Sequence, residues 1–231
     1  MENSKMKYIA SAIVILFIVM IPLVGLPLIS WTGNENKISP ETIPTVYDEE
    51  ENHCELVGTN ARSDLAGEFV SATNLLAAYI DVSISDVYDN FNFGDSSLED
   101  FVGDSVTGYA MPSAVTIALG NVISQKGLGS SYSAQNVTGT LWGQVLNRLN
   151  DGIPLMVWIT SDMEDPKDVT HMDDGDTWYS NRKVVVIYRV EDSTVYAIDP
   201  VDGKTTYNES YFEGLYEMCG QKCVMIRRTV I

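Results

Sequence analysis

Cysteine is scarce in this chain, since three of its 231 residues are cysteine. Cys54 stands alone, while Cys219 and Cys223 are close enough in sequence to form a bridge outside the cytoplasm. Three cysteines cannot make the disulfide framework of a small secreted scaffold. The paired cysteine and histidine spacing of a zinc site is also missing. We therefore expect no metal and no other cofactor.

Positive charge is equally sparse, with 14 Lys and Arg against 32 Asp and Glu and a formal charge of −18. Such a field repels phosphate backbones and anionic lipid heads, and it favours cations and basic peptides. Nucleic acid is therefore not expected as a partner. The acidic stretch 162–176 lacks both the D-x-D-x-D-G order and the bidentate glutamate of a calcium loop, so we interpret it as a solvated surface loop.

One long run has no charge at all: residues 8–31 read YIASAIVILFIVMIPLVGLPLISW. About 20 apolar residues are what a ~30 Å hydrocarbon layer requires, so this run predicts a transmembrane anchor. Lys5 and Lys7 precede it, which predicts a cytoplasmic N-terminus (1–7) and an extracytoplasmic C-terminal part. A cleavable signal peptide is the alternative, but no A-x-A-like site follows the run. The chain is therefore predicted to be a single-pass protein of the cell membrane.

The rest of the chain divides into a tether and one domain. Residues 32–45 are polar and contain two prolines, which is typical of a linker. Residues 46–231 are long enough for a single domain with a sizeable core.

Helical patterns come first in this domain. Apolar residues at helical spacing predict a buried helix from Glu68, and Ser83 begins a shorter helix with a capping-box pattern. Pro112 stands near the start of a third helix. A fourth is predicted to begin near Thr138 and to stop at Gly152.

The second half of the domain contains short β-branched and aromatic runs that are typical of strands, at 153–159, 184–188, 194–198 and 223–226. This segregation predicts an α+β domain in which a helical half packs against an antiparallel sheet.

The order of four segments carries a resemblance to a known family. They are GEFVSATNLLAAY from Gly67, GIPLMVWIT from Gly152, KVVVIYRVED from Lys183 and VYAIDPVDG from Val195. This order resembles the papain-like cysteine peptidases, specifically the bacterial peptidases related to the bacteriocin-processing, double-glycine-cleaving domain. In that family the matching segments read G-C-E-x-x-S-A/T-x-x-L-L-x-Y, G-x-P-V-x-V-W-x-T, H-x-V-V-x-x-G-Y-D and a strand ending in Asp-Pro. The resemblance implies a papain-like fold for the whole domain.

The same resemblance implies that the catalytic residues are lost. The family needs a thiolate at the start of a buried helix, an imidazole, and an acid that orients it. The nucleophile position holds Glu68, the histidine position holds Lys183, and only Asp199 is as the family has it. The glutamine of the family's oxyanion hole is missing too, because no glutamine precedes Gln125. We therefore expect a pseudopeptidase.

Glu68 and Lys183 conserve one negative and one positive charge, so we hypothesise an ion pair between them with Asp199 near Lys183. The alternative is that both point to solvent. Such a domain would bind a peptide or an envelope protein in the old substrate cleft, which Tyr109, Trp158 and Trp178 are predicted to line.

Two other functions stay open at the level of sequence. Cys54 and His171 have nearly the spacing of Glu68 and Lys183, so they are the alternative catalytic pair of an active thiol hydrolase. The residues after Cys54 are a poor start for a buried helix, however, and His171 lies in a polar loop. The third possibility is a purely structural envelope domain whose cleft has closed.

Overall fold

A computed structural model describes residues 46–48, 53–55, 64–172 and 177–229. The predicted anchor (8–31) and the whole tether (32–45) lie outside these residues. The chain divides into two units, 1–39 and 40–231, and the fold below is that of the second. Within the described ranges no helix has both the length and the apolar character needed to cross a bilayer.

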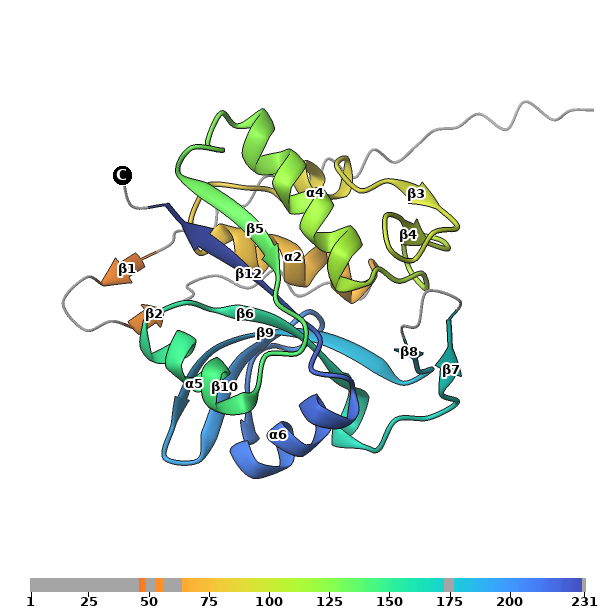
Figure 1. Cartoon of the computed structure of the whole chain (residues 1–231), viewed down its shortest axis with the longest axis vertical. Helices are drawn as coiled ribbons and strands as arrows, with labels where there is room; N and C mark the ends of the chain where they lie inside the picture. The colour runs from red at the N-terminus through yellow and green to blue at the C-terminus, as the bar shows by residue number, and fades with distance from the viewer. Residues whose placement is uncertain (1–45, 49–52, 56–63, 173–176, 230–231) are drawn as a thin grey trace, which may run out of the picture. The chain divides into compact units, whose positions relative to one another are not determined.

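A six-stranded sheet forms the middle of the domain (Figure 1). Its strand order is β11-β10-β9-β6-β12-β5, and every neighbouring pair is antiparallel. The strands are β5 (Tyr132–Asn136), β6 (Leu155–Thr160), β9 (Arg182–Glu191), β10 (Thr194–Asp199), β11 (Gly203–Asn208) and β12 (Cys223–Arg228). Three two-stranded pairs accompany it: β1 (Val46–Asp48) with β2 (His53–Glu55), β3 (Phe93–Gly94) with β4 (Phe101–Val102), and β7 (Thr170–His171) with β8 (Thr177–Trp178).

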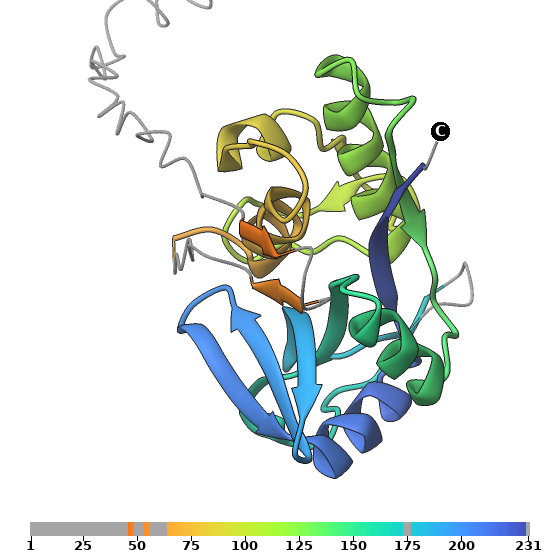
Figure 2. The same ribbon diagram turned by 90° about the vertical axis from the view of Figure 1, so that its left-hand side faces the viewer.

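Helices cover both faces of the sheet (Figures 1 and 2). One face packs against α2 (Gly67–Ala77), α3 (Ile84–Tyr88) and α4 (Pro112–Gln125), and the other against α5 (Trp142–Asn150) and α6 (Glu209–Met218). A 3₁₀ turn, η1 (Ser161–Met163), follows β6. Because side chains alternate along a strand, Val184 and Val186 of β9 join the α2 core while Val185 and Ile187 join the α5–α6 core.

The predicted α+β class and the packing of helices on an antiparallel sheet are confirmed. Helices α2, α3 and α4 occupy the predicted segments, and α3 begins with the Ser83–Asp86 capping box. The four predicted strands are β6, β9, β10 and β12. The prediction that all helices precede the strands is wrong, because α6 lies between β11 and β12 and covers the second face.

The predicted start of the fourth helix is also wrong. Helix α5 begins at Trp142, not near Thr138. The backbone before it continues the sheet instead, since the N–H groups of Val137 and Gly139 donate to the carbonyls of Cys223 and Gln221. Pairing with β12 therefore holds this segment extended past the end of β5.

Candidate functional site

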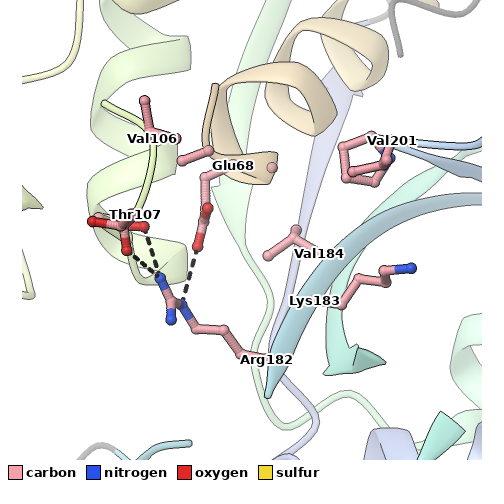
Figure 3. Close-up of a pocket in the computed structure, with 11 residues that line it drawn as sticks. Glu68, Val106, Thr107, Arg182, Lys183, Val184 and Val201 are labelled. Carbon is pink, nitrogen blue, oxygen red and sulfur yellow. Dashed lines mark hydrogen bonds and ion pairs between the residues drawn. The ribbon is translucent and has the colours of Figure 1, made fainter. Parts of the chain in front are cut away.

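The start of helix α2 lies against the end of strand β10. A side chain on Gly67 would approach the Pro200 ring within 3.0 Å, so glycine is what allows the helix to begin so close to the strand. The next residue, Glu68, is only 3% exposed and points its carboxylate away from the helix toward β9 (Figure 3). The predicted nucleophile position is therefore at a buried helix N-terminus.

Glu68 pairs with Arg182 and not with Lys183. Its Oε1 lies 3.5 Å from Nε of Arg182, whereas no ion pair joins Glu68 to Lys183 in this part of the described chain (Figure 3). The hypothesised ion pair between Glu68 and Lys183 is therefore wrong, and the partner of Glu68 is the preceding residue of the strand, Arg182. The reason is the alternation of a strand: Arg182 lies on the same face of β9 as Val184, which packs on α2, and Lys183 lies on the other face.

Lys183 pairs instead with Asp199, which was expected from the sequence to lie near it. Its ammonium lies 2.6 Å from a carboxylate oxygen of Asp199, which is 1% exposed. Burial alone would raise the pKa of Asp199, but Lys183 and the backbone N–H groups of Val201 and Asp202 outweigh it and hold the pKa below its ordinary value. Asp199 is therefore held in its charged form.

The pKa of Glu68 shifts in the opposite direction to that of Asp199. Burial raises the pKa of its carboxyl group, and the opposing effects of the Arg182 charge and of the N–H groups of Glu68 and Ala110 do not cancel it. The two carboxyl groups therefore differ in acidity although each has a cationic partner.

Arg182 joins the helical half of the domain to the sheet. Its guanidinium donates to the carbonyls of Gly108, at 2.7 Å, and Thr107, at 3.4 Å (Figure 3). It also lies 5.1 Å from the centre of the Tyr109 ring and 5.3 Å from that of the Trp178 ring, within cation–π range. Two of the three predicted cleft residues, Tyr109 and Trp178, thus gather around Arg182.

Trp158 does not lie at this surface, and its placement in the cleft was wrong. It belongs to β6, a central strand whose residues are all buried, and it is 2% exposed. Its indole N–H donates to the carbonyl of Ala110 at 3.2 Å. Trp158 therefore supports the loop beneath Tyr109 from inside the core.

A pocket of about 200 Å³ opens beside these groups and is called the α2–β9 pocket below. Its floor contains Glu68, Arg182 and Lys183. Its rim contains Val106 and Val201, which are about half exposed at 51% and 50%. A polar floor between two apolar rim residues can hold one side chain of an extended partner.

Sequence reasoning missed Arg182. The signal was available, because the even-numbered residues of the run after it are those that face α2. Because residues two apart in a strand share a face, Arg182 lies on the same face as Val184 and therefore faces Glu68 of α2.

The two described thiols lie elsewhere. Cys219 and Cys223 are both free and buried, and Cys223 packs in the α5–α6 core with its Sγ 3.2 Å from the Tyr216 hydroxyl. Burial raises the pKa of both thiols. Neither is the reactive thiolate that acyl transfer needs.

The alternative pair, Cys54 and His171, is placed only in part. Cys54 is the middle residue of β2, and its side chain lies outside the described residues. His171 ends β7 with an exposed side chain, and its Nδ1 lies 3.5 Å from the Thr177 hydroxyl.

The described part of the acidic stretch is held by local contacts. Glu164 pairs with Lys167, and Asp168 accepts from the Ser180 hydroxyl at 2.7 Å. In the ranges that the structure describes, no three His, Cys, Asp or Glu side chains are grouped as metal ligands.

Comparison of sequences finds no matching family model and no matching characterised protein. Comparison of structures finds a protein of Bacillus anthracis described as a C39-like peptidase, with a TM-score of 0.61 and 17% identity over 73% of this chain and 91% of that one. A double-glycine motif protease from an AMS/PCAT transporter, solved with a leader peptide, matches at a TM-score of 0.40 and 13% identity over 81% and 92% of the two chains. The Pseudomonas avirulence protein AvrPphB matches at 0.25 and 14% over 52% and 62%. The first likeness shows that this domain has the fold of C39-like, papain-like peptidases, and the other two are too distant to carry an argument.

Proposed function

We propose that this chain is a membrane-anchored, catalytically inactive papain-like domain that binds an extended peptide, free or part of an envelope protein, in the α2–β9 pocket. One observation carries the proposal. Two ion pairs, Glu68–Arg182 and Lys183–Asp199, stand at the positions where the sequence resemblance to double-glycine peptidases would put a thiolate and an imidazole.

These side chains cannot perform the family's reaction. A carboxylate that attacked a peptide would form an anhydride, which is far less accessible than a thioester. Lys183 is engaged in an ion pair with Asp199 at 2.6 Å, and an amine does not replace the imidazole that accepts and returns a proton near neutral pH. Binding without hydrolysis is what this arrangement supports.

The size and lining of the pocket favour a peptide over a small molecule. At about 200 Å³ it is smaller than the roughly 300–1,000 Å³ of typical small-molecule sites, so it suits one side chain of a longer ligand. Val106 and Val201 would contact apolar groups on either side of that chain. The charge of −18 favours a basic peptide.

The uncharged run 8–31 supports a location at the membrane. An uncleaved anchor there would leave the domain outside the cytoplasm, next to envelope proteins and secreted peptides.

The proposal is tested by fluorescence anisotropy with the full chain and a panel of labelled basic peptides. Val201→Gln should weaken binding about fivefold because a rim contact worth ~1 kcal/mol is lost. Met218→Gln is the matched control, since Met218 is equally exposed on α6 and should leave affinity unchanged. Equal affinities for both variants and the parent chain would contradict binding at this pocket, and hydrolysis of the peptides would contradict inactivity.

A further inference from the structure

A second and larger pocket lies at the opposite end of helix α2. Its volume is about 590 Å³, which falls within the range of small-ligand and peptide sites. It is bounded by the residues that end α2, by β5, by the turn between α5 and β6, and by the last residues of β12. We call it the α2–β12 pocket.

The pocket exists because strand β12 extends beyond strand β6 at this end of the sheet. Strand β12 continues to Arg228, but its pairing with β6 reaches only Leu155, which lies opposite Met225. The residue before Leu155 is Pro154, which has no N–H to donate to β12. The sheet is therefore notched beside Ile226 and Arg228.

The hydrogen-bond pattern shows which backbone groups face this notch. The Lys222 carbonyl accepts from Trp158 of β6, whereas the Cys223 carbonyl accepts from Val137 on the β5 side. Bonding direction alternates along an antiparallel strand, so even-numbered residues of β12 face β6. The carbonyl of Ile226 and the backbone groups of Arg228 therefore point to the side where β6 is missing.

The floor of the pocket is aromatic and apolar. The rings of Tyr79 and Tyr132 meet edge to face with centres 5.9 Å apart, and Ile153 and Ile226 complete the apolar lining. A planar or branched apolar group would bury its surface here at a gain of about 25 cal/mol per Å².

The rim is positive on a strongly negative molecule. Arg227 and Arg228 are exposed there and face a single acidic lining residue, Asp151, so one positive charge is in excess at a site on a chain of net charge −18. Paired N–H donors of arginine match the geometry of a carboxylate.

We propose that the α2–β12 pocket binds the C-terminal end of an extended peptide whose last side chain is apolar or aromatic. The peptide backbone pairs with Ile226 and Arg228 in the notch, as a strand added to an open sheet edge. Its last side chain packs on Tyr79 and Tyr132, and its terminal carboxylate pairs with Arg227 or Arg228. This site shares no lining residue with the α2–β9 pocket and does not depend on the function proposed for that pocket.

The test is fluorescence anisotropy of the full chain with the peptide Gly-Gly-Ser-Ala-Phe, labelled at its N-terminus. Saturable binding is expected, and amidation of the peptide's C-terminus should weaken it at least tenfold. Combined Arg227→Gln and Arg228→Gln substitution should have a similar effect. Lys204→Gln is the control, because Lys204 is an equally exposed cation on the far edge strand β11.

Several results would overturn the proposal. No saturable binding, or equal affinity for the acid and the amide, would remove the carboxylate site. If an amidated peptide ending in Glu binds as well as Gly-Gly-Ser-Ala-Phe with a free C-terminus, the pocket does not recognise a chain terminus. Dimerisation in sedimentation that the arginine substitutions abolish would make a second copy of this chain the occupant.

Discussion

The cationic partners of buried Glu68 and Asp199 are decided by a shift of one residue along a strand. Arg182 and Lys183 are neighbours, yet one faces α2 and pairs with Glu68 while the other pairs with Asp199. Both carboxylates are nearly inaccessible to water. Their pKa values move in opposite directions because burial prevails at Glu68 and the lysine and backbone donors prevail at Asp199.

The raised pKa of Glu68 predicts how its contribution to stability depends on pH. A group with a raised folded-state pKa stabilises most below its unfolded value, about 4.3 for glutamate, and loses that contribution as pH rises through the folded value. The free energy of unfolding of the parent chain should therefore fall relative to Glu68→Gln as pH rises above about 4. The fall is about 1.4 kcal/mol for each unit by which the pKa is raised. Urea unfolding at several pH values measures it.

Asp199→Asn is the control, because the contribution of Asp199 to the free energy of unfolding depends on pH in the opposite direction. The depressed pKa of Asp199 means that its contribution is present above about pH 3.9, the unfolded value, and is lost as pH falls through the folded value. If instead the parent chain gained stability over Glu68→Gln as pH rose, attraction to Arg182 would outweigh burial and the description of Glu68 would be wrong.

At the scale of elements, α2 is the helix on which both pockets depend. It is buried along almost its whole length, with Phe69, Leu75 and Leu76 fully covered. Its polar residues differ in their partners: the Ser71 hydroxyl donates to the Val184 carbonyl at 2.8 Å, but the buried Asn74 amide has no hydrogen-bond partner among the described residues. A buried unpaired amide costs about 1–3 kcal/mol.

Asn74→Leu should therefore stabilise the domain. Leucine has the same number and branching of side-chain heavy atoms and removes the unpaired donor and acceptor, so the free energy of unfolding should rise by about 1–2 kcal/mol in urea denaturation. Ser71→Ala is the matched comparison one turn away, and it should lower the free energy of unfolding by about 1 kcal/mol because the Val184 carbonyl loses its donor. A destabilised Asn74→Leu variant would show that the amide has a role in the folded state.

Elements whose signals are local could be predicted from the sequence, and those that depend on pairing could not. The capping box at Ser83 and the proline at the start of α4 fix their helices through neighbouring residues. The residues before α5 and those of β5 gain their conformation from β12, which is far away in sequence. The same holds at the site, where the expected proximity of Asp199 to Lys183 is seen but the role of Arg182 depends on the face of β9 that meets α2.

At the scale of the whole molecule, a papain-like fold carries two pockets at the two ends of one buried helix. The helix N-terminus and the facing strand of a peptidase are present, but the described side chains there are charged pairs. Both described cysteines are buried on the other face of the sheet. The account therefore predicts a domain that binds and does not cleave.

The most direct test of that claim follows the reactivity of every thiol in the folded full chain. Alkylation by iodoacetamide between about pH 5 and pH 9, read by mass spectrometry, should leave Cys219 and Cys223 unmodified because burial protects them. Cys54 should show no fast alkylation at acidic pH, and His171→Ala should not change its rate. Fast alkylation of Cys54 at acidic pH that His171→Ala abolishes, together with peptide hydrolysis, would contradict the account and make the protein a thiol hydrolase.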